Sequence, residues 1–343
     1  MRLFLLVLAA LPAMAWADAP APADAGRNAQ EQCLLDLMRS LPPDTTLAEL
    51  RQRCAPVEAA VQKPAAPVPQ PTATTQVETD GSVNNRLADE WKAYDNPFAL
   101  ALYRPSYFIF GYQFSPPNEA PFTSVLGPGQ PNFQNVEAKF QISLKFPLAL
   151  NLFDSNVDLI AAYTNRSFWQ SFNHSLSSPF RETDHEPEAW LRWRTDFDFL
   201  GGRIRTLNLG IDHQSNGQSG TLSRSWNRIF AETFYERGPF GLDLRVWHRI
   251  QENPASDDNP DILDYMGHFQ LTGIYHHGKH EFTAMGRYVP GTGHGAYQLD
   301  WSYPLYKNLH GYVQWFDGYG ESLIDYNYRT RSLGIGVQLG EWL

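Results

Sequence analysis

From about residue 97 to the C-terminus, apolar and polar residues alternate along segments of about ten residues. Ala138, Phe140 and Ile142, for example, interleave with Lys139 and Gln141. Successive side chains of a β-strand point to opposite faces, so each segment has one apolar and one polar face. A water-soluble β-sandwich shows the same period, because it buries its apolar face in a core. The density of Arg and Asp on the polar face, and the final apolar segment with its aromatic end, favour a transmembrane β-barrel.

The number of such segments is about twelve, an even number as expected for a bacterial single-chain barrel. The predicted fold is therefore all-β: a twelve-stranded antiparallel transmembrane barrel, preceded by a small helical, disulfide-stapled extension in the periplasm. The predicted strands are residues 106–115, 134–147, 157–170, 186–199, 203–215, 225–236, 241–251, 262–276, 280–289, 295–303, 309–317 and 332–342.

Composition agrees with a barrel without requiring one. The mean hydropathy is -0.41, although 14% of the residues are aromatic. A polar lumen and aromatic girdles give a barrel both properties, but a secreted β-sandwich has them too. The formal net charge of -10 and the pI of about 5.4 argue against nucleic-acid binding.

The N-terminal residues 1–17 are typical of a secretory signal peptide. Arg2 precedes a short apolar stretch that ends at the small-x-small site Ala15-Trp16-Ala17, and the stretch is too short for a confident membrane helix. Beyond it, no continuous apolar run is long enough to cross a bilayer as a helix. The expected location is the cell outer membrane, with an N-terminal extension in the periplasm.

The two cysteines, Cys33 and Cys54, lie in a small unit predicted over residues 18–60. A zinc site needs further Cys or His ligands nearby, and a catalytic thiol needs a local base. In an exported chain a structural disulfide is the favoured interpretation. The Pro-, Ala- and Thr-rich residues 61–85 read as an extended linker, and the barrel domain is predicted over residues 86–343.

His213, Ser215 and Asn227 form the candidate catalytic group. On a strand, His213 and Ser215 share a face with the apolar residue Ile211, and in a barrel that face meets lipid. Asn227 shares parity with Ile229 on the next segment and also faces outward. A hydroxyl, a base and a group that orients the base are the components of serine hydrolysis. A polar cluster near the membrane rim, where polarity is tolerated, fits the parity equally well.

Several motifs resemble the outer membrane phospholipase A family of Gram-negative bacteria, over roughly residues 86–343 and in the same order. The central motif is His213-Gln214-Ser215-Asn216-Gly217 followed by Ser223-Arg224-Ser225-Trp226-Asn227-Arg228. Three further stretches match: Ser178-Pro179-Phe180-Arg181-Glu182-Thr183, Asp257-Asp258-Asn259-Pro260-Asp261-Ile262 and Gly318-Tyr319-Gly320-Glu321-Ser322-Leu323-Ile324-Asp325-Tyr326-Asn327.

The resemblance implies a calcium-dependent phospholipase A that cleaves sn-1 and sn-2 acyl esters of phospholipids and lysophospholipids. It assigns Ser215 as the nucleophile, His213 as the general base and Asn227 as the residue that orients His213. The backbone N–H of Gly217 is implied as an oxyanion donor. The implied partners are membrane phospholipid and a second copy of the chain, because the active form of the family is a homodimer.

The resemblance also implies a set of calcium ligands, and calcium prefers oxygen donors. These are Ser223, the carbonyl of Gln218 and Ser177 of a partner subunit, with Asp258 corresponding to a further ligand. Gln218 stands where an Arg is expected, and Gly220 stands where an Asp is familiar, which leaves a second calcium site open. Asn165 replaces an outward-facing Gln at the family's dimer interface.

Two other functions remain compatible with a barrel. A passive porin or channel predicts a wet lumen. A structural or adhesive barrel predicts long outer loops, whereas the loops expected here are short. The inward-facing Arg192, Arg194, Asp196, Arg228 and Glu232 predict a cross-linked plug instead of an open channel.

Overall fold

The computed structural model describes residues 82–94, 100–127 and 129–339. They belong to one compact unit, Gln76–Leu343. The expected signal peptide, the Cys33–Cys54 disulfide, the unit over 18–60 and nearly all of the linker lie outside the described residues. No helix of the described part is long and apolar enough to cross a membrane.

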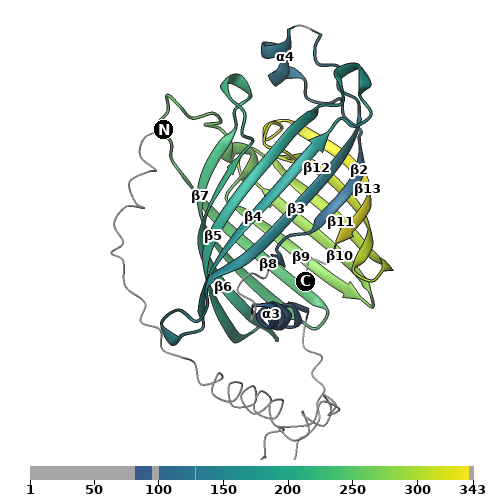
Figure 1. The fold of residues 1–343 in the computed structure, drawn as a ribbon. Helices are drawn as coiled ribbons and strands as arrows, with labels where there is room; N and C mark the ends of the chain where they lie inside the picture. The colour runs from purple at the N-terminus through teal and green to yellow at the C-terminus, as the bar shows by residue number, and fades with distance from the viewer. Residues whose placement is uncertain (1–81, 95–99, 128, 340–343) are drawn as a thin grey trace, which may run out of the picture. The chain divides into compact units, whose positions relative to one another are not determined.

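The strands of the described residues form one antiparallel sheet that closes into a barrel (Figure 1). The short β1 pairs only with β3, and the other twelve strands follow one another around the wall until β13 pairs with β2. The predicted twelve-stranded antiparallel barrel is confirmed. The strands are β1 (Ala101–Leu102), β2 (Ser106–Gln113), β3 (Val136–Ala149), β4 (Val157–Trp169), β5 (Phe180–Phe199), β6 (Gly202–Ser215), β7 (Ser225–Arg237), β8 (Phe240–Ile250), β9 (Phe269–His277), β10 (His280–Tyr288), β11 (Gly295–Tyr306), β12 (Leu309–Tyr319) and β13 (Arg329–Leu339).

Three α-helices and three short 3-10 helices lie between the described strands or before them. They are α3 (Ser82–Ala93), α4 (Ala120–Leu126), α5 (Leu263–Met266), η1 (Leu152–Asp154), η2 (His174–Leu176) and η3 (Gly220–Leu222).

The wall has its apolar face outside and its charged face inside. Along β8 the exposed residues Leu242, Leu244 and Val246 alternate with Asp243 and Arg245, which are 3% and 5% exposed. A water-soluble sandwich would bury the leucines and expose the charges. The inverted arrangement is that of a barrel whose outer surface meets lipid.

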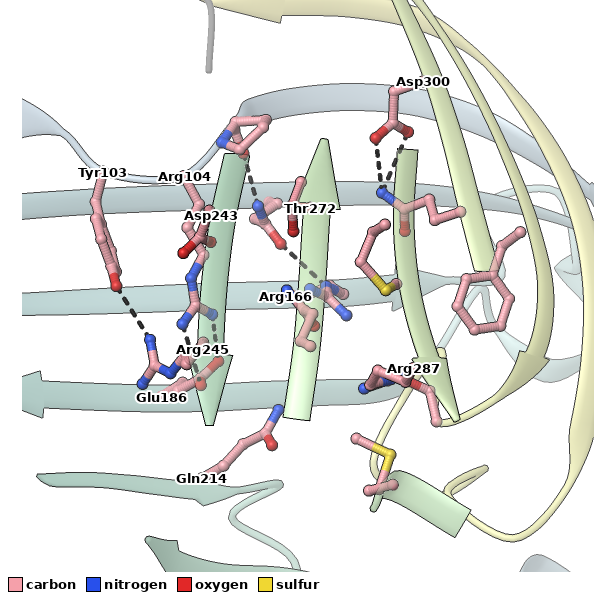
Figure 2. Close-up of a pocket in the computed structure, with 18 of the residues that line it drawn as sticks. Tyr103, Arg104, Arg166, Glu186, Gln214, Asp243, Arg245, Thr272, Arg287 and Asp300 are labelled. Carbon is pink, nitrogen blue, oxygen red and sulfur yellow. Dashed lines mark hydrogen bonds and ion pairs between the residues drawn. The ribbon is translucent and has the colours of Figure 1, made fainter. Parts of the chain in front are cut away.

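The lumen is crossed by ion pairs. Arg245 bonds to Glu188 and Asp212, each at 2.7 Å, and Arg228 bonds to Asp212 at 2.6 Å and Glu186 at 2.8 Å. Buried charges are stable only when they are paired, so each of these carboxylates is balanced by arginine. Among them remains a cavity of about 120 Å³, with a largely polar lining (Figure 2).

Helix α3 lies at one end of the barrel (Figure 1). Its first turn donates the backbone N–H groups of Val83 and Asn84 to the Glu236 carboxylate, at 3.0 and 3.2 Å. Glu90 forms ion pairs with Lys145 at 2.5 Å and Arg192 at 3.0 Å. Burial opposes the ionisation of Glu90, but the neighbouring cations outweigh it and lower its pKa to about 2. The helix is thus held to the barrel by buried charge.

The starts of two predicted strands were wrong by six residues or more. The segment predicted as a strand over 262–276 begins as α5, and the strand starts only at Phe269. Ile262 and Met266 are buried in an aromatic cluster, and Gly267, with a φ of 66°, ends the helix. Strand β5 begins at Phe180 instead of residue 186, because residues 181–184 are polar on both faces and give no apolar alternation.

Candidate active site

His213 on β6 and Asn227 on β7 are direct cross-strand partners. Their side chains lie on the outer face, and His213 Nδ1 is 2.9 Å from Asn227 Oδ1. The neighbouring outward residues Leu209 and Ile211 are 59% and 58% exposed. The strand pattern therefore places an imidazole and an amide side by side on the surface that meets lipid.

The amide of Asn227 is held from its other side by a residue that the sequence did not reveal. Asn227 Nδ2 donates to Glu252 Oε1 at 3.1 Å, so Oδ1 is directed at the imidazole. An amide oxygen only accepts, so His213 carries its proton on Nδ1 and leaves Nε2 as a base. Glu252 lies in the loop after β8, where alternation carries no information about direction.

Ser215 is two residues beyond His213 on β6 and points to the same outer face. Its cross-strand partners are Ser225 on β7 and His185 on β5. Within the described residues the Ser215 hydroxyl has no hydrogen-bond partner. The hydrogen bond from Ser215 to His213 is therefore not formed in this structure. Catalytic hydrogen bonds in substrate-free enzymes are often long and tighten when substrate binds.

The turn after Ser215 is built around the buried side chain of Asn216. Asn216 Oδ1 accepts the backbone N–H groups of Gln218 at 3.2 Å and Arg224 at 3.0 Å. Its Nδ2 donates to Glu182 and to the Leu222 carbonyl. These bonds hold the turn that contains the exposed Gly217, two residues after Ser215, with a φ of 65° that favours glycine.

The barrel wall behind the site is locked by inward-facing residues of the same two strands. Asp212 and Arg228, which are next to His213 and Asn227 along their strands, form a pair at 2.6 Å across β6 and β7. Trp226 is fully buried and donates its indole N–H to Gln214 at 2.8 Å. The register that juxtaposes His213 and Asn227 is thus held from the lumen side.

Oxygen ligands gather next to the same turn. Ser223 Oγ donates to Asp258 Oδ2 at 2.6 Å, and Ser225 Oγ lies 3.4 Å from that oxygen. The side chain of the buried Asn259 accepts the backbone N–H of Ser225 at 3.0 Å, which fixes the Asp258 loop against β7. A carboxylate and hydroxyls form a hard donor set of the kind that calcium prefers.

The remaining predicted ligand positions lie around this group. Gln218 is exposed within the turn, and Gly220, with a φ of 63°, has open space where a side chain would be. Ser177 is exposed at the end of η2, in the separate loop between β4 and β5. Within one chain, Ser177 makes no described contact with Ser223 or Asp258.

Asn165 faces outward on β4, opposite His185. Its Nδ2 lies 3.4 Å from His185 Nδ1, and its Oδ1 accepts the hydroxyl of Ser167 at 3.2 Å. This outward-facing amide therefore has hydrogen-bond partners within its own chain. His185, which the sequence reading did not single out, belongs to the same outer surface as Ser215.

Residues 83–339 match the family model of phospholipase A1. Phospholipase A1 of Escherichia coli (strain K12) is 40% identical over 255 residues, which cover 74% of this chain and 86% of that protein. The protein of the same name from Klebsiella pneumoniae is 38% identical over 255 residues, covering 74% of this chain and 87% of its own length.

Solved structures agree. Outer membrane phospholipase A from E. coli is similar with a TM-score of 0.68 and 39% identity, covering 72% of this chain and all of that one. A Salmonella typhi outer membrane phospholipase dimer with bound calcium has a TM-score of 0.68 and 40% identity, covering 72% of this chain and 94% of that one. The match spans the whole barrel and its outward-facing site: this chain belongs to the phospholipase A1 family of outer-membrane β-barrels.

Proposed function

We propose that the protein is a calcium-dependent outer-membrane phospholipase A that hydrolyses the sn-1 and sn-2 acyl esters of phospholipids and lysophospholipids. Ser215 is the nucleophile, His213 the general base and Asn227 the residue that orients it. The observation that carries the proposal is the 2.9 Å contact of His213 Nδ1 with Asn227 Oδ1 on the lipid-facing surface. A substrate that reaches this surface is itself a membrane lipid.

The proposed reaction follows from the tautomer of His213, which carries its proton on Nδ1 and has Nε2 free as a base. His213 Nε2 accepts the proton of Ser215 as Oγ bonds to the ester carbonyl carbon, whose π electrons move to the oxygen. When the tetrahedral intermediate collapses, the ester C–O bond breaks and His213 returns the proton to the leaving lysolipid alkoxide. Water then attacks the acyl-Ser215 ester by the same route, releasing fatty acid and restoring the serine.

A neutral amide changes where the charge must be stabilised. Asn227 accepts the Nδ1–H of His213 but cannot balance the imidazolium as a carboxylate would. More of the stabilisation therefore falls on the oxyanion, for which the Gly217 N–H is the proposed donor. This assignment is supported by the exposed, left-handed Gly217 two residues after Ser215.

Ser223, Asp258 and the carbonyl of Gln218 are the proposed calcium ligands of this chain, completed by Ser177 of the partner subunit. The 2.6 Å contact of Ser223 with Asp258 supports the choice, because both supply oxygen next to the Gly217 turn. When bound, calcium supplies positive charge beside the developing oxyanion. The calcium-bound dimer of the S. typhi relative supports a homodimeric active form, with Asn165 at its interface.

The lumen disfavours the alternative of a passive channel. The arginine–carboxylate pairs cross the interior beside a cavity of about 120 Å³, so the described lumen is filled by paired charged side chains (Figure 2). The decisive experiment is acyl release from detergent-dispersed phospholipid, measured with calcium and with a chelator. We expect release only with calcium. A calcium-independent or absent release from folded barrel would reject the proposal.

A further inference from the structure

We infer that the imidazole of His185 is a second hydrogen-bond donor to the oxyanion, beside the Gly217 N–H. The inference rests on the proposed function, because it takes Ser215 as the nucleophile. It deepens that function by assigning a catalytic role to a residue of β5, outside the His213–Ser215–Asn227 group.

His185 lies next to the nucleophile on the same outer face. It is the direct cross-strand partner of Ser215 between β5 and β6. Directly opposed side chains in an antiparallel pair have Cβ atoms about 5 Å apart. Ser215 is therefore flanked by His213 along its own strand and by His185 across the strand.

The hydrogen bonds of His185 define which nitrogen carries the proton. Tyr163 Oη is 2.5 Å from His185 Nδ1, and Asn165 Nδ2 is 3.4 Å from the same atom. An amide nitrogen only donates, and Asn165 Oδ1 is already occupied by the Ser167 hydroxyl. Nδ1 is therefore the acceptor, so the neutral ring carries its hydrogen on Nε2.

The protonated edge of the ring lies beside Gly217. A Cβ placed on Gly217 would be 3.9 Å from His185 Nε2 and 3.8 Å from its Cδ2. Within the described residues, no group accepts the Nε2–H. The structure thus holds an oriented donor without an acceptor next to the backbone that is the proposed oxyanion donor.

The Nε2–H of His185 can stabilise the negative charge that develops during the reaction. When Ser215 Oγ bonds to the carbonyl carbon, the carbonyl oxygen takes the electron pair and becomes an oxyanion. His185 donates its Nε2–H to that oxygen and keeps the proton throughout, while His213 carries the transferred proton. When the carbonyl re-forms, the electron pair returns and the hydrogen bond weakens. Because Asn227 is neutral, an added donor at the oxyanion is especially valuable.

The test compares H185F with H185Q. Phe preserves a flat ring without a donor, whereas Gln places an amide N–H at a similar reach. Loss of one oxyanion donor lowers kcat by about 100-fold or more in other hydrolases, so we expect a fall of about 100-fold in H185F. We expect KM to stay within about twofold, because the donor acts in the transition state, and H185Q to recover most of kcat.

Substrates and controls separate this role from others. The assay uses dispersed phosphatidylcholine and a p-nitrophenyl acyl ester, which has no phosphate. An oxyanion donor affects kcat for both. Unchanged kcat in H185F, a loss confined to phosphatidylcholine, or an equal loss in H185F and H185Q would overturn the inference. Heat-modifiable migration of each variant verifies that the barrel is folded.

A second variant covers the case in which H185F does not fold. Y163F removes the shorter of the two hydrogen bonds that hold Nδ1 as the acceptor, and we expect kcat to fall by about two- to fivefold with KM unchanged. Unchanged kcat in Y163F would overturn the assigned tautomer and with it the inference. S215A, assayed in parallel, distinguishes failure of the proposed function from failure of the role of His185. Activity in S215A rejects the proposed function. Inactive S215A together with normal activity in H185F rejects only the role of His185.

Discussion

Glu252 accepts a hydrogen bond from Asn227 Nδ2 at 3.1 Å, and so turns the other end of that amide toward His213. A carboxylate thus acts on the imidazole through an intervening amide. The negative charge that an Asp would place directly on the base lies one residue further away. Substitutions of Asn227 and Glu252 therefore test how the imidazole of His213 is oriented.

Asn227→Ala should lower kcat by about 10- to 100-fold without abolishing it, because His213 still reaches Ser215 but samples unproductive orientations. N227D should retain more activity than N227A, since a carboxylate accepts the same Nδ1–H. It also places two carboxylates together, so N227D/E252Q should exceed N227D. Steady-state kinetics on dispersed phospholipid measure all three, and equal activity of wild type, N227A and N227D would show that Asn227 orients nothing.

Ser215→Ala should abolish acyl release, by at least about 1000-fold, while leaving a folded, heat-modifiable barrel. One partly exposed hydroxyl, which has no hydrogen-bond partner among the described residues, contributes little to the stability of the wall. Fatty-acid release is the readout. Substantial lipolysis by S215A would remove Ser215 as nucleophile, and with it the catalytic assignment.

Asp258→Asn should raise the calcium concentration for half-maximal activity by about tenfold or more, because it removes the carboxylate from the ligand group. S223A should shift it in the same direction by less. Calcium titrations of acyl release measure both shifts. Asp257, which pairs with Arg249 at 2.6 Å, gives the control D257N, whose calcium dependence should be that of wild type. An unchanged midpoint in D258N would place the calcium site elsewhere.

Activity should fall on dilution of the protein and recover at higher calcium, if Ser177 of the partner subunit completes the site. Covalent reaction of Ser215 with a sulfonyl ester should promote calcium-dependent dimers, because the bound acyl mimic adds apolar contact between subunits. Chemical cross-linking across a dilution series tests this. Only monomers, together with full calcium-dependent turnover at high dilution, would leave a self-contained monomeric lipase.

Glu90→Gln should destabilise the barrel at pH 7, because it leaves Lys145 and Arg192 without their shared carboxylate. A carboxyl whose folded pKa is depressed from 4.5 to about 2 stabilises the fold above pH 4.5, and that contribution disappears as the pH falls through about 2. The difference in unfolding free energy between wild type and E90Q should be on the order of 3 kcal/mol at pH 7 and vanish near pH 2. Denaturant titrations at several pH values measure it; a pH-independent difference would contradict it.

Parity along strands predicted much of this molecule from sequence. It placed His213, Ser215 and Asn227 on one outward face, and the structure has them there. Parity works because a strand has a period of two residues and the wall has one wet and one lipid face. It fails where the backbone is not extended, and for that reason Glu252 and α5 were missed.

His185 was missed for a different reason. Its strand segment, residues 181–186, is polar on both faces and so carries no alternation. Its closeness to Ser215 depends on the register between β5 and β6, which a sequence read segment by segment does not specify. Register also determines that Asn165 lies opposite His185, whereas its other partner, Ser167, lies two residues along the same strand.

The ion pair of Asp212 with Arg228 has a consequence for how such an enzyme can change. Inward residues such as these keep β6 and β7 in register, while most outward residues face the lipid. Alternate positions of one strand are therefore under different constraints: the inward positions maintain the register, and the outward positions form the lipid-facing surface. We expect substitutions at the outward positions to change the lipid-facing surface while the paired inward positions preserve the barrel.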